Sequence, residues 1–440
     1  MKALLPLLLP LLAWLCPALA TAADEADAKK EKEPPSLAEV AAAKQDALLM
    51  LREELPNPEP GGPQHGRGLG VFISADGLAL LNLMNLATAN KPEILTADGK
   101  TMLPLGSILG IFPEPELALV KLKHKPKTWV PLARKEPEVG ESIAIAGLSD
   151  FNPTGRKVEP VLGPVLAKRS TLGGNLREPT FRKIMSLGAG FNLQQKQAFA
   201  QGSWAVNRQG ELVAVKCGVQ MAGNPATGTQ MLIMLSPLAG IVEQVDAMVK
   251  SAKPIPFPLP AASNPIDLAL LDAAYNYYDK AYQARDFETA RKWTEELRKR
   301  YPDSKFIAGL TPTDMTDLAE LPRLEASAPV ASQVQRLRAR ADFLVTRKKD
   351  QEGAIAELKA ALPLCPEDFP EIHLAISVLL AQLGHLDEME PVLLKLHALE
   401  PDSISIAALL EARMTQKGKH EEAQKFTDRI FELENLYRAK

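Results

Sequence analysis

The stretch GRGLGVFISADGLALLNLMNLATA, residues 66–89, sets the character of the first half of the chain. Two apolar runs, residues 70–74 and 78–83, flank Asp76-Gly77, a dipeptide typical of a tight turn between antiparallel strands. Similar runs follow at residues 94–96, 117–122, 142–147, 163–168 and 211–218. Short strands separated by turn signals in this way predict an all-β unit, a sandwich or a pair of barrels, over residues 64–250.

Five landmarks in this unit resemble, in the same order, the trypsin-like serine peptidases of the Deg/HtrA type. Residues 66–89 resemble the first-barrel segment that leads to the catalytic histidine, and LTADGKTMLPLGSILGIFPEPELALVKL (95–122) resembles the hairpin and strand that carry the acid. VGESIAIAG (139–147) and GPVLAKRS (163–170) resemble strands of the second barrel, and QGSWAVNRQGELVAVKCG (201–218) resembles the nucleophile loop. The resemblance implies a trypsin-like double β-barrel.

The same resemblance places the three catalytic positions on unsuitable residues. The histidine position falls on Met84, the aspartate position on Glu116 and the serine position on Gln201, with Asn207 and Gly210 setting the register. The reaction needs a base within hydrogen-bond reach of a hydroxyl and an acid that orients the base. Methionine cannot accept the proton and an amide is a poor nucleophile, so the resemblance implies a pseudoprotease with a degenerate triad.

Two residues leave an enzymatic alternative open. Ser203 lies two positions after Gln201, so a local shift of the loop would present it as a displaced nucleophile, and His124 is a candidate displaced base. The more conservative interpretation makes Ser203 a turn residue ahead of a strand and His124 a solvated histidine at a hairpin end. We favour the conservative interpretation, because neither Ser203 nor Asn85, which adjoins the histidine position, supplies a base.

Four similar segments occupy the last third of the chain, where the pattern becomes helical. Small or apolar marker positions recur at Ala290, Ala354, Met389 and Ala423, and a proline follows the first three after twelve residues, at positions 302, 366 and 401. The last two marker steps, 35 and 34 residues, match the 34-residue period of tetratricopeptide (TPR) repeats. An irregular helical bundle has no reason to repeat such spacing, so residues 266–440 are predicted to be an all-α, TPR-like repeat domain.

The start of the chain has the pattern of an export signal. Residues 1–22 combine a short positive start, an apolar run and small residues suited to cleavage, so we expect a signal peptide and a periplasmic or extracellular protein. Residues 23–35 are charged and predict a disordered linker, whereas residues 36–56 predict one amphipathic helix. Prolines crowd residues 251–265 and predict a stiff linker between the two domains.

Composition excludes several classes of function. Lys and Arg number 51 and Asp and Glu 54, so the net charge of −3 gives no sign of a nucleic-acid-binding protein. No motif indicates a metal, a nucleotide or another cofactor, and no later stretch is long enough to span a membrane. The basic run at residues 121–127 is interpreted as a solvated hairpin end. Of the three cysteines, Cys217 and Cys365 follow the signal peptide, and both are expected to be buried and unpaired.

These observations favour a binding protein over an enzyme. The main hypothesis is an exported pseudoprotease with TPR repeats that acts as a scaffold or adaptor for proteins or peptides, through the barrel cleft and the concave face of the repeats. The alternative is a divergent serine endopeptidase with a displaced nucleophile such as Ser203. A third possibility assigns all binding to the repeats and makes the barrel a structural cap.

Overall fold

The structure is a computed structural model of the chain and describes residues 34–54, 65–83, 86, 93–112, 114–147, 159–174, 179–192, 203–222, 230–251, 253–255, 291–292, 294–295, 298–299 and 323–437. Residue contacts divide the chain into two units, Met1–Ser36 and Leu37–Lys440. All elements described below belong to the second unit. The predicted signal peptide and all but two residues of the predicted charged linker lie outside the described residues.

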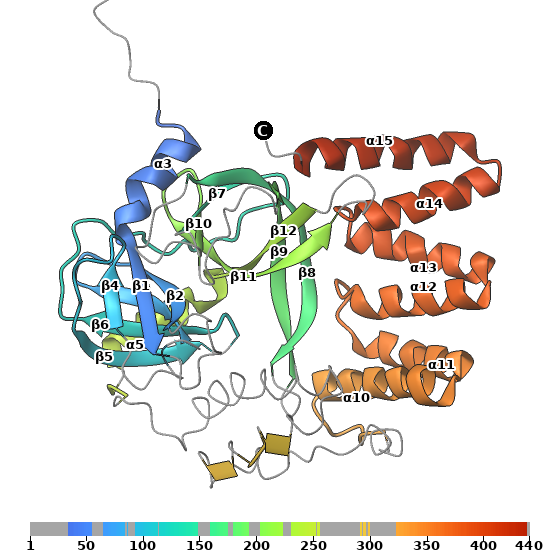
Figure 1. Cartoon of the computed structure of the whole chain (residues 1–440), viewed down its shortest axis with the longest axis horizontal. Coiled ribbons are helices and arrows are strands. Elements are labelled where there is room, and N and C mark those ends of the chain that lie inside the picture. Colours follow the sequence, from blue (N-terminus) through green and yellow to red (C-terminus); the bar gives the residue numbers. More distant parts are fainter. Residues whose placement is uncertain are drawn as a thin grey trace, which may run out of the picture. The chain divides into compact units, whose positions relative to one another are not determined.

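The first β unit is a six-stranded antiparallel sheet with the strand order β4-β1-β2-β3-β6-β5 (Figure 1). Its strands are β1 (Leu48–Glu54), β2 (His65–Phe72), β3 (Leu78–Asn82), β4 (Glu93–Thr96), β5 (Leu105–Phe112) and β6 (Leu117–Leu122). The turn between β2 and β3 is built at Gly77, whose φ of 92° belongs to the left-handed region where glycine is favoured. The predicted Asp76-Gly77 turn is therefore confirmed.

The prediction of one helix over residues 36–56 is wrong in its second half. Helix α3 (Leu37–Lys44) is followed by the short 3₁₀ turn η1 (Gln45–Ala47), and the chain then enters strand β1. β1 pairs with β2 on one side and β4 on the other, and Leu48, Leu49 and Leu51 are almost fully buried. A strand covered on both faces carries a continuous apolar run, and such a run cannot be told from a buried helix by periodicity.

The second β unit is a closed barrel with the order β10-β11-β12-β9-β8-β7. Its strands are β7 (Ser142–Ala146), β8 (Val161–Gly174), β9 (Pro179–Asn192), β10 (Trp204–Val206), β11 (Leu212–Ala222) and β12 (Gln230–Pro237). The turn η3 (Ala239–Ile241) and helix α5 (Val242–Ser251) follow β12 and close this region. Within the described residues, only the second of the two β-sheets closes into a barrel. The prediction of two barrels is therefore confirmed in full only for residues 142–237.

The described helices of the C-terminal region form successive antiparallel pairs. They are α10 (Val330–Phe343), α11 (Gln351–Ala361), α12 (Glu371–Leu383), α13 (Leu386–Leu399), α14 (Ile404–Gln416) and α15 (His420–Tyr437), with a π-helical turn η4 (Leu344–Lys348) after α10 and a 3₁₀ turn η5 (Leu362–Leu364) after α11. The marker residues Ala354, Met389 and Ala423 are buried in the helical core. α11 and α13 end shortly before Pro366 and Pro401, while Ala290 and Pro302 lie outside the described residues.

The long β8–β9 hairpin packs against these helices. Leu172 and Phe181 of the hairpin join the helical core, and the ring of Phe181 meets Phe369 edge to face with the centroids 5.3 Å apart. Leu166 packs with Ile404 and Leu433 in a smaller apolar cluster. Leu37–Lys440 is accordingly one compact unit, and the helices contact the barrel directly, in place of the separation that the proline-rich segment had led us to expect.

Candidate functional site

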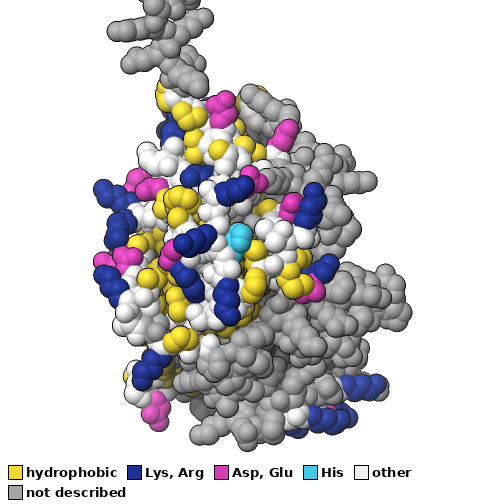
Figure 2. Space-filling model, turned by 90° about the vertical axis from the view of Figure 1, so that its left-hand side faces the viewer, with side chains coloured by type: hydrophobic (Ala, Val, Ile, Leu, Met, Phe, Trp, Pro, Cys, Tyr) yellow, Lys and Arg dark blue, Asp and Glu magenta, His cyan; other side chains and the backbone are white. Residues whose placement is uncertain are grey.

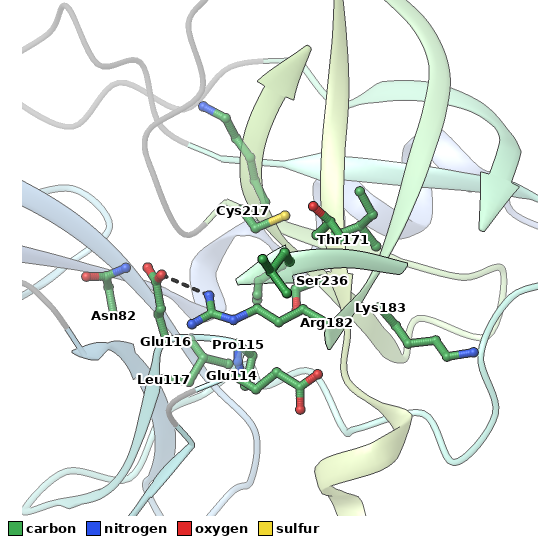
Figure 3. Close-up of a pocket in the computed structure, with 14 residues that line it drawn as sticks. Asn82, Glu114, Pro115, Glu116, Leu117, Thr171, Arg182, Lys183, Cys217 and Ser236 are labelled. Atoms are coloured by element: carbon green, nitrogen blue, oxygen red, sulfur yellow. Dashed lines mark hydrogen bonds and ion pairs between the residues drawn. The ribbon is translucent and has the colours of Figure 1, made fainter. Parts of the chain in front are cut away.

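A cavity of about 190 Å³ lies between the first sheet and the second barrel. The first unit contributes residues from the end of β3 and the start of β6, and the second contributes β8, β9, β11 and β12. The described lining consists of Asn82, Glu114, Pro115, Glu116, Leu117, Thr171, Leu172, Arg182, Lys183, Ile184, Val215, Lys216, Cys217 and Ser236. Figure 3 shows Arg182 reaching towards Glu116 across this cavity, while Lys183 points away from that pair.

Glu116, the residue in the acid position of the family resemblance, is part of this cavity. Its carboxylate Oε1 lies 3.3 Å from Nη1 of Arg182, which extends from β9 of the second barrel (Figure 3). Glu116 has a φ of 56°, a left-handed conformation that is uncommon for a residue with a Cβ and that concentrates at functional sites. The acid is thus held in a strained backbone and neutralised by an arginine of the opposite unit.

The segment that leads to the histidine position forms a main-chain hydrogen bond with Glu116. Leu83 N donates a hydrogen bond of 2.8 Å to Glu116 O, so the end of β3 and the start of β6 lie side by side. Met84 and Gln201, the residues in the histidine and serine positions, lie outside the described residues. Of the three predicted triad positions, the described structure therefore places only Glu116.

Ser203 is fully buried in front of β10. Its exposed fraction is 0%, and its carbonyl accepts a hydrogen bond of 2.6 Å from Lys216 N. It immediately precedes β10, where Trp204 pairs with Val215. This position agrees with a residue ahead of a strand, and Ser203 is not in the described lining of the cavity. A substrate would reach its hydroxyl only if the loop moved.

Asn207 and Gly210, the residues that set the sequence register, form a turn. Asn207 Oδ1 accepts hydrogen bonds from Gln209 N and Glu211 N, the pattern of an Asx turn, and Gly210 has a φ of 73°. This turn joins β10 to β11. Because Asn and Gly are the residue types that such a turn requires, the motif was readable from the sequence.

Cys217 in β11 is exposed, contrary to the expectation of a buried cysteine, and it lines the cavity. The residue as a whole is exposed, but burial of its sulfur raises the pKa of the Cys217 thiol to about 11, and the negative charge of Glu116 adds to this effect. The thiolate is the nucleophilic form of cysteine, so a thiol with a raised pKa is a weak nucleophile at neutral pH. The cavity therefore does not activate Cys217.

No histidine is among the described residues that line the cavity. His124 is half-buried at the far end of β6, where its ring packs against Phe72 with the centroids 5.9 Å apart. His65 begins β2. The described part of the chain also contains no group of three or more His, Cys, Asp or Glu side chains that could hold a metal ion. The described side chains that line the cavity thus include charged groups and hydrogen-bonding groups, but no imidazole base.

Sequence reasoning missed the second-barrel half of the cavity. Arg182 and Lys183 lie on a long strand whose sequence carries no motif, and their proximity to Glu116 depends on the packing of two units. The same hairpin faces the helices: Thr171 Oγ1 and Leu172 N donate hydrogen bonds to Glu371 at the start of α12. The β8–β9 hairpin therefore lines the cavity and also contacts the helical region.

Comparisons with known proteins found similar solved structures but no related sequence family. No protein-family model matches the sequence, and no curated protein matches it. Similar solved structures are trypsin-like and HtrA-type serine proteases. The Rv3671c protease from M. tuberculosis in its active form is 17% identical, with a TM-score of 0.37 over 49% of this chain and 86% of that chain. The HtrA-type protease AlgW with tripeptide is 20% identical, with a TM-score of 0.36 over 49% of this chain and 64% of that chain.

A third similar structure is the MamO protease domain from Magnetospirillum magneticum in its apo form, which is 16% identical, with a TM-score of 0.33 over 46% of this chain and 96% of that chain. At these identities and TM-scores the similarities carry no conclusion about activity. In the part of the chain that the structure describes, no helix has both the length and the apolar character needed to cross a bilayer.

Proposed function

We propose that this chain is an exported scaffold or adaptor that binds a protein or a peptide, built on a trypsin-like framework without peptidase activity. The observation that carries the proposal is the pairing of Glu116 with Arg182 in the cavity. In a working triad the acid orients a histidine base. Here the residue in the acid position is engaged by a guanidinium that cannot accept a proton at physiological pH.

The cavity has the properties of a binding site. Its wall combines cationic side chains, Arg182, Lys183 and Lys216, with the carboxylates of Glu114 and Glu116 and the hydroxyls of Thr171 and Ser236. Such groups can fix the orientation of a bound segment by hydrogen bonds and charge pairing. The raised pKa of the Cys217 thiol and the complete burial of Ser203 support binding rather than catalysis, because neither residue is an activated, accessible nucleophile.

The helical region provides the second surface of the proposed adaptor. We assign residues 266–440 to TPR-like repeats, supported by the paired helices and by the burial of the marker residues Ala354, Met389 and Ala423. The prolines after α11 and α13 support the same assignment. The β8–β9 hairpin contributes to both the cavity and the helical core, so both proposed surfaces share one pair of strands. The N-terminal signal peptide and linker complete the proposed domain order.

The competing function is a serine endopeptidase that uses Ser203. A fluorophosphonate probe and labelled casein distinguish the two, applied to the chain without residues 1–22 and to its Gln201→Ser and Ser203→Ala variants. The proposed binding function predicts no labelling and no casein turnover by the natural chain. Labelling of the natural chain that disappears in the Ser203→Ala variant would establish the peptidase and overturn the proposal.

Binding itself is tested with a displayed library of random peptides selected on the same chain. Peptides that bind the cavity should lose affinity when Arg182→Glu reverses the charge beside Glu116. The matched control is Arg134→Glu, which reverses an exposed arginine that pairs with Asp246 on the surface. Equal affinity for the natural chain and the Arg182→Glu variant would show that the cavity is not the binding site.

A further inference from the structure

The segment after β6 presents a row of cationic side chains that the proposed adaptor function does not use. Residues 117–135 contain six Lys or Arg residues and no Asp or Glu, in a chain with a net charge of −3. Exposure alternates along residues 123–129: Lys123, Lys125, Lys127 and Trp129 are exposed, and the residues between them are half-buried. Three exposed lysines and an exposed tryptophan therefore lie within seven consecutive residues of one surface segment.

The row is held in place by contacts at both ends. Lys123 N donates to Pro104 O at 3.0 Å, and Val130 N donates to Phe72 O at 2.9 Å. The side chain of Val130 is fully buried, and His124 packs on Phe72. Lys44 of α3 donates to Trp129 O at 3.1 Å, which brings a fourth lysine beside the tryptophan. The segment is therefore a fixed feature of the fold rather than a loose hairpin end.

The lysines of the row are available to an external anion. Lys121 pairs with Asp76, whereas Lys123, Lys125 and Lys127 form no ion pair with any residue that the structure describes. Trp129 is 38% exposed, so an apolar surface lies beside the lysines. Figure 2 views the left-hand side of Figure 1, where β4, β5 and β6 lie, and shows Lys and Arg side chains gathered around a histidine on that face.

We propose that this row, Lys123, Lys125, Lys127 and Trp129, binds the surface of a membrane that contains anionic phospholipid. Lysines are compact charges that respond to the diffuse negative potential of a lipid surface, whereas recognition of one phosphate or carboxylate favours the forked guanidinium of arginine. Tryptophan prefers the boundary between headgroups and acyl chains. An acidic peptide would satisfy the lysines but would give the exposed indole no apolar environment.

Vesicle sedimentation tests the proposal with the chain that lacks residues 1–22, because all described elements lie in the compact unit Leu37–Lys440. Binding is expected to vesicles of phosphatidylcholine mixed with phosphatidylglycerol, and not to phosphatidylcholine alone. It should weaken about fivefold for each lysine changed to Gln and on the order of a hundredfold for all three. Trp129→Ala should weaken it further, and added salt should abolish it because exposed charges are screened.

The matched control changes three exposed lysines elsewhere, Lys250, Lys395 and Lys425, to Gln. This variant has the same net charge, so it should bind mixed vesicles as the natural chain does. An equal loss in both triple variants would mean that net charge alone attracts the chain, and would overturn the proposal. It would be overturned equally by binding to polyglutamate without binding to mixed vesicles, which would identify an acidic polypeptide as the partner.

Discussion

Arg169 of β8 and Asp402, in the turn before α14, form a buried ion pair between the second barrel and the helices. Nη1 of Arg169 lies 3.0 Å from Oδ1 of Asp402, and the two residues are 2% and 1% exposed. Ser186 of β9 donates its hydroxyl hydrogen bond to the other carboxylate oxygen of Asp402. Glu400 adds a second carboxylate, 3.6 Å from Arg169 Nε. The contact between the barrel and the helices is thus charged at its centre and buried from solvent.

Replacing Arg169 with Met should lower the free energy of unfolding by about 3–5 kcal/mol, because it leaves Asp402 charged and buried without its cation. Urea denaturation followed by circular dichroism measures this change. The surface pair Arg134–Asp246 is the control, and Arg134→Met should change stability by at most about 0.5 kcal/mol. Equal effects of the two substitutions would mean that the Arg169 pair is as solvated as the surface pair.

Gly77→Ala should destabilise the first sheet strongly. Besides the φ of 92°, a Cβ at this position would lie 2.1 Å from His124 O, which belongs to the segment that carries the lysine row. We expect a loss above about 2 kcal/mol, from strain and from the displaced backbone together.

Gly140→Ala separates the two causes. Gly140 has a similar φ of 90°, but nothing lies within 4 Å of its ideal Cβ. Gly140→Ala should therefore lower the free energy of unfolding only by the cost of the left-handed backbone, about 1–2 kcal/mol. Thermal unfolding of both variants provides the comparison, and an equal loss would show that the contact with His124 is relieved by a small shift.

Much of the fold was predictable because its local signals are strong. Asp76-Gly77 is a turn dipeptide because glycine accepts a left-handed φ, and this turn forms where the sequence predicts it. The helical pattern around Ala354 and Met389 was also predicted, and both residues are buried in the helical core. Residues 48–54 were misassigned because a doubly buried strand and a buried helix share the same apolar composition.

Only the part of the cavity that the first β-sheet contributes was predictable from the sequence. Glu116 was identified through an ordered set of landmarks, whereas Arg182 is brought to it by the packing of β9 against another unit. No local pattern records such a contact, since the two residues are 66 positions apart in the chain. The ion pair of Arg169 and Asp402 was missed for the same reason: a buried arginine in a strand has the sequence appearance of an exposed one.

Cys217 should react slowly with a disulfide reagent although it is exposed. The pKa of its thiol is raised from 9.0 to about 11, so at pH 8 its thiolate fraction should be about a hundredfold below that of a free thiol. The rate constant should keep rising up to about pH 11. The measurement uses a Cys365→Ser variant of the chain without residues 1–22, so that Cys217 is the single thiol. A rate that levels off near pH 9 would contradict the prediction.

His397 should make the helical region less stable as the pH falls. Burial, followed by the positive charge of Arg429, lowers the pKa of His397 below its usual 6.5, and its ring packs edge to face on Phe426 at 5.3 Å. The unfolded chain therefore takes up this proton at a higher pH than the folded chain, so stability is retained above about pH 6.5 and lost on acidification below it.

His397→Phe keeps the aromatic packing and removes the proton site, so the melting temperature should fall less between pH 7 and pH 5 than in the natural chain. The same change at the exposed His420 controls for the loss of any histidine and should leave the pH dependence as it was. If His397→Phe and the natural chain lose stability in parallel, the imidazole of His397 takes up its proton in the folded state without cost, and acid sensitivity must arise from other groups.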